Sequence, residues 1–125
     1  MICGLGIDLV EIARIEEMLA RWPQRFAQRV FTPEEIALCE GRAQRAAAFA
    51  ARFAAKEAFA KALGTGVDRN FAWKDFAVLN HSNGRPLPVL SPRLSARLAD
   101  VQVHLSLSHT EHAATAVVVL ERPWG

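Results

Sequence analysis

The spacing of apolar side chains divides the first part of the chain into a strand and a helix. Ile2–Leu9 is almost continuously apolar, which predicts a buried strand that ends on the carboxylate of Asp8. The next large apolar residues recur at helical spacing, at Ile12, Ile15, Leu19 and Trp22. This period predicts a helix over Val10–Trp22, and Pro23 is expected to end it.

Two further helices are predicted from their end signals and composition. Thr32 stands before a proline and three positions before Glu35, which is the pattern of an N-terminal capping box. A helix should therefore run from here to about Glu40 and stop at the glycine that follows. Arg42–Leu63 is rich in alanine and contains no glycine or proline, which predicts a long helix that ends at Gly64.

The second half of the chain predicts mainly strands. Phe71–Leu79 and Arg85–Leu90 flank an Asn-Gly turn and should form a hairpin, with two prolines confining the second strand to an edge. A short helix is expected over Ser91–Asp100. Val101–Ser108 alternates between apolar and polar residues, and Ala114–Glu121 forms a final strand. The order predicts an α+β fold, a mostly antiparallel sheet packed with helices, in a single domain over residues 1–125.

Composition narrows the class of protein without identifying it. The 125 residues are 51% hydrophobic and 22% charged, with a net charge of +2, which is typical of a globular protein and gives no sign of a nucleic-acid partner. No apolar stretch approaches the length of a membrane span, and no basic segment precedes the first strand. Cys3 and Cys39 form no disulfide framework, so buried or half-buried free thiols and a cytoplasmic location are expected.

Two acids are candidates for chemistry, although each also has a structural explanation. Asp8 follows Gly4 and Gly6, which permit close approach of another backbone. It is either the N-cap of the next helix or a ligand. Glu57 lies on the long helix, where it either forms a salt bridge with Lys61 or binds a ligand. Two carboxylates are what Mg²⁺ often receives from a protein, but the pair alone is a weak signal.

Basic residues accompany the acids on two predicted helices. On the long helix they are Arg45, Arg52, Lys56 and Lys61, which form either a solvated face or a phosphate site, and Gly64-Thr65-Gly66 adds backbone donors. On the first helix Arg14, Met18 and Arg21 share one side, with Arg25 just beyond. That stripe is either plain solvated surface or a docking site for an acidic helix. His104, His109 and His112 lack standard zinc spacing, and His109 suits a hydrogen bond to a ligand or within its turn.

Three blocks of sequence together resemble one family, the holo-acyl-carrier-protein synthases of the 4′-phosphopantetheinyl transferase group. The blocks are Gly4–Ile15, Arg52–Gly66 and His104–Thr110, and they occur in the order typical of the family. Phe31–Glu35 and Asn83–Pro86 also fit, so the resemblance spans nearly the whole chain. His112 stands where relatives often have tyrosine, which puts only the local packing in doubt.

The resemblance implies a fold, an activity and roles for individual residues. It implies the 4′-phosphopantetheinyl transferase fold and the transfer of 4′-phosphopantetheine from coenzyme A to a serine of apo acyl carrier protein, in fatty acid biosynthesis. Asp8 and Glu57 would bind Mg²⁺ and, with Lys61, form the catalytic set. The implied coenzyme A site consists of Arg45, Arg52, Lys61, Gly64, Arg85, Pro86 and His109. Arg14, Met18, Arg21 and Arg25 would bind the carrier, and the expected assembly is a homotrimer.

Some alternatives stay open at this point. The carrier belongs either to fatty acid synthesis or to a polyketide or other specialised pathway. A non-catalytic module that binds coenzyme A or docks a carrier is a third possibility, which the combination of two acids with basic residues disfavours. The proton of the serine is expected to pass to a water held by the metal or by one carboxylate.

Overall fold

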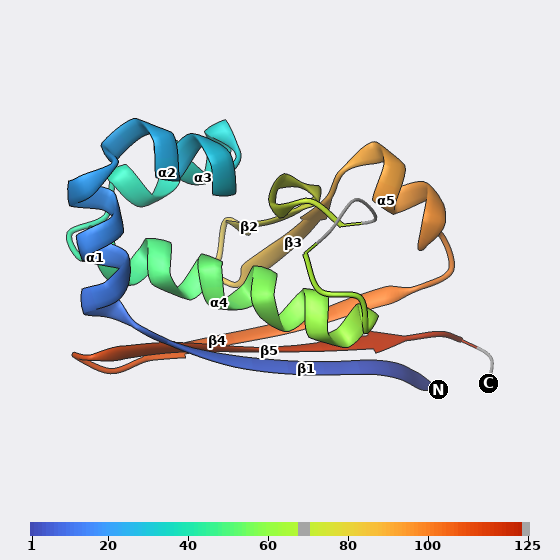
Figure 1. Ribbon diagram of the computed structural model, residues 1–125. Helices are drawn as coiled ribbons and strands as arrows, with labels where there is room; N and C mark the ends of the chain where they lie inside the picture. The colour runs from blue at the N-terminus through green and yellow to red at the C-terminus, as the bar shows by residue number, and fades with distance from the viewer. Residues whose placement is uncertain (68–70, 124–125) are drawn as a thin grey trace.

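The protein is described by a computed structural model that covers residues 1–67 and 71–123 (Figure 1). The helices are α1 (Ile12–Arg21), α2 (Pro23–Val30), α3 (Pro33–Glu40), α4 (Arg45–Leu63) and α5 (Pro92–Arg97), with a 3-10 turn at Trp73–Asp75. The strands are β1 (Ile2–Glu11), β2 (Phe76–Asn80), β3 (Pro86–Leu90), β4 (Gln102–His109) and β5 (Ala113–Glu121). The predicted α+β class is confirmed.

The strands form two antiparallel sheets rather than one. The larger sheet has the order β1-β5-β4, and β2 pairs with β3 in a separate hairpin. Figure 1 shows α4 lying along one face of the larger sheet, while the other described helices and the hairpin lie beyond α4. The alternation predicted for β4 is confirmed, because its apolar residues are half-buried and its polar residues are exposed.

The prediction of a buried strand at the N-terminus is wrong. β1 continues past Asp8 to Glu11, and it lies at the edge of its sheet with only one face covered. Leu5, Ile7 and Leu9 point to the uncovered face and are 65%, 62% and 70% exposed. The continuous apolar pattern concealed this arrangement because both faces of the strand carry apolar residues.

Helix α1 ends before Pro23, as predicted, but the helix α2 that follows was not predicted. Pro23 also occupies the first turn of α2, where its missing N–H costs no hydrogen bond, so the same residue follows one helix and begins the next. Trp22, expected on the buried side of α1, is 39% exposed at this junction. The capping box of α3 is confirmed, with the Thr32 hydroxyl accepting from Glu35 N and the Glu35 carboxylate accepting from Thr32 N.

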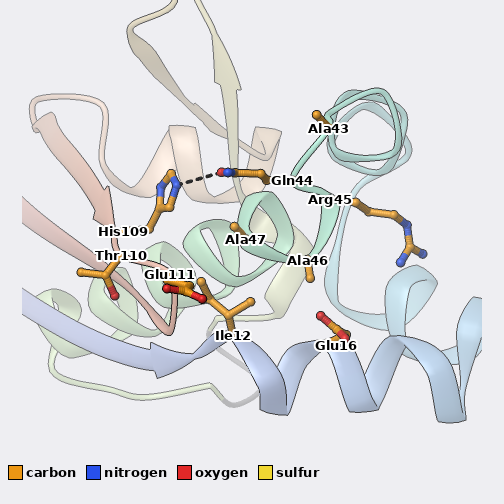
Figure 2. A pocket seen from close by; sticks show the side chains of 10 residues that line it. All are labelled: Ile12, Glu16, Ala43, Gln44, Arg45, Ala46, Ala47, His109, Thr110 and Glu111. Carbon is orange, nitrogen blue, oxygen red and sulfur yellow. Dashed lines mark hydrogen bonds between the residues drawn. The ribbon is translucent and has the colours of Figure 1, made fainter.

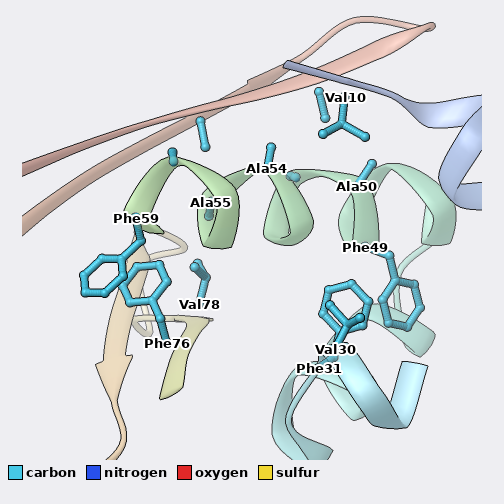
Figure 3. Close-up of a cluster of buried hydrophobic side chains, with 14 of the residues drawn as sticks. Val10, Val30, Phe31, Phe49, Ala50, Ala54, Ala55, Phe59, Phe76 and Val78 are labelled. Atoms are coloured by element: carbon cyan, nitrogen blue, oxygen red, sulfur yellow. The ribbon is translucent and has the colours of Figure 1, made fainter. Parts of the chain in front are cut away.

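Helix α4 is the centre of the core. Figure 3 shows Ala50 and Ala54 directed toward the sheet side, where Val10 lies, while Phe49 and Phe59 point the opposite way. There Phe59 stacks on Phe76 with 4.2 Å between ring centroids. Small residues on one side of α4 let the sheet pack closely. Aromatic rings on the other side fill the wider space between α4 and the layer formed by α3 and the hairpin.

The ends of α4 and the hairpin largely follow the predictions. Gly64 ends α4 in the left-handed conformation with φ of 81°. The hairpin turn has Gly84 at φ of 90°, which suits the predicted Asn-Gly pair. Its first strand is shorter than predicted, because the 3-10 turn precedes Phe76.

Candidate functional site

Asp8 reaches the surface of α4 because two glycines let β1 approach the helix backbone. A Cβ atom on Gly6 would lie 1.8 Å from the carbonyl oxygen of Ala58, and one on Gly4 would lie 2.4 Å from that of Ala62. The prediction that these glycines permit close approach is therefore confirmed. The main chain of Asp8 is held by the Thr115 hydroxyl, which donates to its carbonyl oxygen at 2.7 Å.

Asp8, Glu57 and Lys61 come together at this contact. Lys61 Nζ donates to Asp8 Oδ1 at 3.1 Å and to the carbonyl oxygen of Ile7 at 3.0 Å. Burial and the nearby charge of Asp8 raise the pKa of Glu57, while the charges of Lys61 and Arg14 act in the opposite direction. Two carboxylates thus lie close enough to repel each other, beside one ammonium group.

The structural explanations considered for the two acids do not hold. The N-cap of α1 is Glu11, without a side-chain capping bond, and Asp8 lies inside β1. Lys61 forms its salt bridge with Asp8 and not with Glu57. Neither acid therefore has the structural role considered for it, although Asp8 is engaged by Lys61.

The acid pair fits a hard divalent cation. Mg²⁺ is usually held by one or two protein carboxylates and completes its coordination with water and phosphate oxygens. Within the described residues no group of three or more His, Cys, Asp or Glu side chains could hold a metal. A cation on Asp8 and Glu57 would also relieve the repulsion that contributes to the raised pKa of Glu57.

A second cluster surrounds two adjoining cavities near the start of α4. One cavity of about 700 Å³ is lined by residues of α1, the segment before α4, the first turn of α4, and the end of β4 with the turn after it, as Figure 2 shows. The other, about 510 Å³, lies toward the hairpin and includes Arg52, Pro86 and His109 in its lining. His109 Nε2 lies 3.2 Å from Gln44 Oε1, and both residues line both cavities.

Arg52 and Asn80 fasten the hairpin turn to α4. Arg52 is 4% exposed. It donates to the carbonyl oxygen of Val78 at 3.1 Å and to Asn80 Oδ1 at 3.0 Å. Arg42 donates to the same Asn80 oxygen at 2.9 Å, and Asn80 in turn donates to the carbonyl oxygen of Gly84. These bonds hold the turn that carries Arg85 and Pro86.

Three of these cavity residues were missed from the sequence. Arg42 and Gln44 lie at the start of the predicted long helix, which begins only at Arg45 in the structure, and Asn80 lies in the segment predicted to be a turn. Nothing in the local pattern distinguished them from ordinary surface residues. Arg45, which was predicted, lines the 700 Å³ cavity and forms a salt bridge with Glu40 at 2.8 Å.

Lys56 has neither of the roles predicted for it, as part of a solvated face or of a phosphate site. Lys56 is fully buried and donates to Glu35 Oε1 at 2.8 Å and to the carbonyl oxygens of Trp73 and Phe76. Glu35 Oε2 also accepts from Val78 N at 2.9 Å. This ion pair joins α3, α4 and the hairpin inside the core, so Lys56 is not part of a solvated face.

The predicted carrier surface crosses from α1 onto α2. Arg14 and Arg21 are exposed on α1, Arg25 is exposed on α2, and Met18 is half-buried between them. The Arg21 guanidinium lies over the Trp22 ring at 4.9 Å from its centroid. The charge of Arg14 is close enough to oppose the rise in the pKa of Glu57, so this end of the surface lies toward the acid pair.

The predicted site residues therefore fall into two groups within one chain. Asp8 and Glu57 are half-buried and Lys61 is exposed, and none of them lines either cavity. Arg45 lies twelve positions before Glu57 on the same helix, which is about 18 Å along the axis. The first group suits a metal and the second a large polar ligand.

Comparison with known proteins identifies the family. Residues 4–118 match the 4′-phosphopantetheinyl transferase superfamily. The chain belongs to this superfamily. A holo-[acyl-carrier-protein] synthase of Koribacter versatilis is 45% identical over 124 residues, covering 97% of this chain and 99% of the relative.

Solved structures of other superfamily members agree with the fold. The holo-[acyl-carrier-protein] synthase of Neisseria meningitidis has a TM-score of 0.90 and 37% identity, covering 98% of this chain and 100% of its own. The Helicobacter pylori enzyme, solved in complex with coenzyme A, has a TM-score of 0.84 and 35% identity, covering 94% and 99%. In the part of the chain that is described, no helix has the length and hydropathy needed to cross a membrane.

Proposed function

We propose that this chain is a Mg²⁺-dependent holo-acyl-carrier-protein synthase that modifies a serine of apo acyl carrier protein. The serine oxygen attacks the phosphorus that bears pantetheine in coenzyme A, and the bond from that phosphorus to the bridging oxygen breaks. The products are the holo carrier and adenosine 3′,5′-bisphosphate, and the serine proton is released. The contact of Asp8, Glu57 and Lys61 across the β1–α4 junction carries this proposal.

The acid pair and Lys61 are assigned the binding and charge stabilisation of the reacting phosphate. Asp8 and Glu57 would hold Mg²⁺, which when bound supplies positive charge to the diphosphate and to the leaving bisphosphate. Lys61 extends from the last turn of α4 and is half-exposed, so its ammonium group can donate to a phosphate oxygen. Phosphoryl transfer depends mainly on such positioning and charge, which makes these three residues the proposed catalytic set.

The remaining coenzyme A contacts are assigned to the cavity group and to the end of α4. We assign this role to Arg45, Arg52, Gly64, Arg85, Pro86 and His109. The adjoining cavities offer room for a large ligand, with Arg45, Arg52 and His109 in their linings. Gly64 ends α4 three residues beyond Lys61, where its backbone lies open to a ligand.

The carrier is proposed to dock on Arg14, Met18, Arg21 and Arg25. These guanidinium groups suit an acidic helix, and the half-buried Met18 offers adaptable apolar contact among them. The nearness of Arg14 to Glu57 would bring a carrier serine docked here toward the acid pair.

A homotrimer is proposed because the family resemblance implies it and because one face of the sheet is left uncovered in a single chain. Joining copies would let the acid group of one chain meet the cavity group of the next. Leu5, Ile7 and Leu9 form an apolar strip on the uncovered face of the sheet, and β5 continues it with Val119, Val117 and Thr115 opposite them. A strip of this kind marks an interaction surface.

We further propose that the reaction takes place in the cytoplasm. Both Cys3 and Cys39 are free thiols, which suits a reducing compartment. Cys3 is exposed, against the expectation that both thiols are buried or half-buried.

Mass spectrometry of apo carrier incubated with the protein, coenzyme A and Mg²⁺ tests the activity. We expect the carrier serine to gain one phosphopantetheine group and EDTA to prevent the gain. Asp8→Ala and Glu57→Ala should abolish most turnover, whereas Glu17→Ala, which removes an exposed acid on α1, should not. No gain of mass, or a gain indifferent to EDTA, would refute the proposal.

Steady-state kinetics test the docking surface. Arg21→Glu should raise KM for the carrier more than KM for coenzyme A, because it reverses a charge that faces an acidic partner. Arg122→Glu, beyond the far end of β5, is the matched control. Arg21 is preferred to Arg14 for this test because the charge of Arg14 also affects the pKa of Glu57. Equal effects on both KM values would exclude the docking role.

Light scattering during gel filtration tests the assembly. The wild-type protein should elute at three times the chain mass of 13.8 kDa, and Ile7→Asp should convert it to monomers that have lost activity. Val89→Asp alters an exposed apolar residue of the hairpin and should leave the trimer intact. A monomeric wild-type protein, or an intact Ile7→Asp trimer, would contradict the assembly.

A further inference from the structure

The salt bridge between Lys61 and Asp8 joins a fixed partner to a movable one. The Asp8 side chain is 19% exposed and that of Lys61 is 56% exposed. The main chain of Asp8 is fixed by strand pairing with Ala116 and by the Thr115 hydroxyl. Lys61 reaches it with a flexible four-carbon stem, so the ammonium group can leave while the carboxylate stays in place.

Lys61 also compensates the charge of the two acids in the absence of metal. Its charge lies close enough to oppose the rise in the pKa of Glu57, and it donates directly to Asp8. A divalent cation held by Asp8 and Glu57 requires the same Asp8 carboxylate. Two cations that share one carboxylate repel each other, so the ammonium group and the metal ion compete for Asp8.

We propose that Lys61 binds the Asp8 carboxylate when no metal is present. Metal binding to Asp8 would then release the Lys61 ammonium group, which becomes able to donate to the diphosphate of coenzyme A. This inference rests on the proposed function, since it takes Asp8 and Glu57 as the metal ligands. It adds an order to the assembly of the site. Before the metal arrives the phosphate-binding lysine is engaged with Asp8 and Ile7, and afterwards it is free to donate to a phosphate oxygen.

Nuclear magnetic resonance of ¹³C-labelled lysine observes this release directly, because the chain has only three lysines, Lys56, Lys61 and Lys74. Lys56 is buried in its ion pair and Lys74 is exposed, so they report the fixed and the mobile limits in the same sample. Without metal the Cε relaxation of Lys61 should lie near that of Lys56. At saturating Mg²⁺ it should move to that of Lys74, with the two reference signals unchanged.

Relaxation of Lys61 that stays the same at saturating Mg²⁺ would overturn the exchange. The measurement uses mobility because a nearby ion alters chemical shifts through its charge even when the lysine stays bound. Saturation is established separately, by competition of Mg²⁺ against Mn²⁺ followed by electron paramagnetic resonance.

Metal affinity gives a second test. Lys61→Met should bind Mn²⁺ about two- to fivefold more tightly than the wild type, the range expected for loss of a half-exposed salt bridge that competes with the metal. Arg14→Met removes a charge that acts on Glu57 only through space, and it should tighten binding less. An equal gain in both variants, or no gain in Lys61→Met, would contradict the exchange.

The acid variants separate failure of this inference from failure of the proposed metal site. Asp8→Asn and Glu57→Gln should each lose Mn²⁺ binding. If they bind Mn²⁺ as the wild type does, the metal assignment itself is wrong, and the exchange fails with it. If they lose Mn²⁺ while Lys61 stays immobile in the metal-saturated wild type, the site stands and only the exchange is wrong.

Discussion

Replacing Gly6 by alanine tests how closely β1 must approach α4. The new Cβ atom would lie 1.8 Å from the carbonyl oxygen of Ala58 and 2.8 Å from its carbonyl carbon. Ordinary contacts between such atoms begin near about 3.4 Å, so the strand must move away from the helix by about 1.5 Å. Both surfaces are backbone, and no side-chain rotamer can absorb the overlap.

The cost of that movement follows from the same geometry. Overpacking a core typically costs about 1 to 3 kcal/mol, and the rigid contact places Gly6→Ala at the upper end, about 3 kcal/mol. Because Asp8 is two residues farther along β1, the strand carries it away from Glu57 and Lys61. A displacement of about 1 Å at a reacting centre can cost 100-fold in rate, so the folded variant should transfer at about 1% of the wild-type rate or less.

Urea unfolding at one protein concentration, paired with the transfer assay, measures both effects. Gly4→Ala should destabilise less than Gly6→Ala, because its Cβ would lie 2.4 Å from the nearest atom, the carbonyl oxygen of Ala62. Gly41→Ala is the matched control, since its nearest atom is 3.6 Å away and its φ is −80°. A Gly6→Ala protein within 0.5 kcal/mol of the wild type, or one less affected than Gly4→Ala, would refute the reasoning.

Three other predictions concern groups outside the site. Lys56→Met leaves the carboxylate of Glu35 buried without its cation and should destabilise by about 3 to 5 kcal/mol in urea unfolding, and a change below about 1 kcal/mol would contradict this account. Burial raises the pKa of the Cys39 thiol to about 11, so at pH 8 Cys39 should resist iodoacetamide in the folded protein and react in urea, as mass spectrometry of the digested protein would show. Burial alone would raise the pKa of Asp75, but hydrogen bonds from Arg93, Ala72 N and Ser91 lower it from 3.8 to about 2. The stability it contributes is therefore fully present above pH 3.8 and is lost as the pH falls toward 2, and Asp75→Asn should make unfolding less dependent on pH in that window.

Local signals were sufficient for most of the secondary structure. The capping box at Thr32 and Glu35, the glycine after Leu63 and the alternation of β4 each depend on neighbours within a few positions. The partners of Asp8 and Lys56 depend instead on residues 53 and 21 positions away. No local period encodes such pairings, so the sequence placed the acids among candidate ligands without showing what each one contacts.

The composition of α4 explains why Lys56 was misplaced. Alanine occurs on every side of this helix, so the hydrophobic pattern does not distinguish its buried side from its exposed side. A lysine on an alanine-rich helix is ordinarily solvated. Its burial requires a carboxylate and carbonyl oxygens that accept hydrogen bonds from the ammonium group. Those acceptors come from Glu35, Trp73 and Phe76, which tertiary packing alone brings to the helix.

The misprediction of β1 has a different origin, and it supports the proposed trimer. A strand that is apolar on both faces predicts burial on both faces, as in the centre of a layered fold. In the single chain only one face is covered, and Leu5, Ile7 and Leu9 are left more than half exposed. Under the proposed assembly the pattern is correct, but it describes burial against another copy of the chain. A solvated edge strand has no need of three large apolar residues on its open face, whereas a subunit interface does.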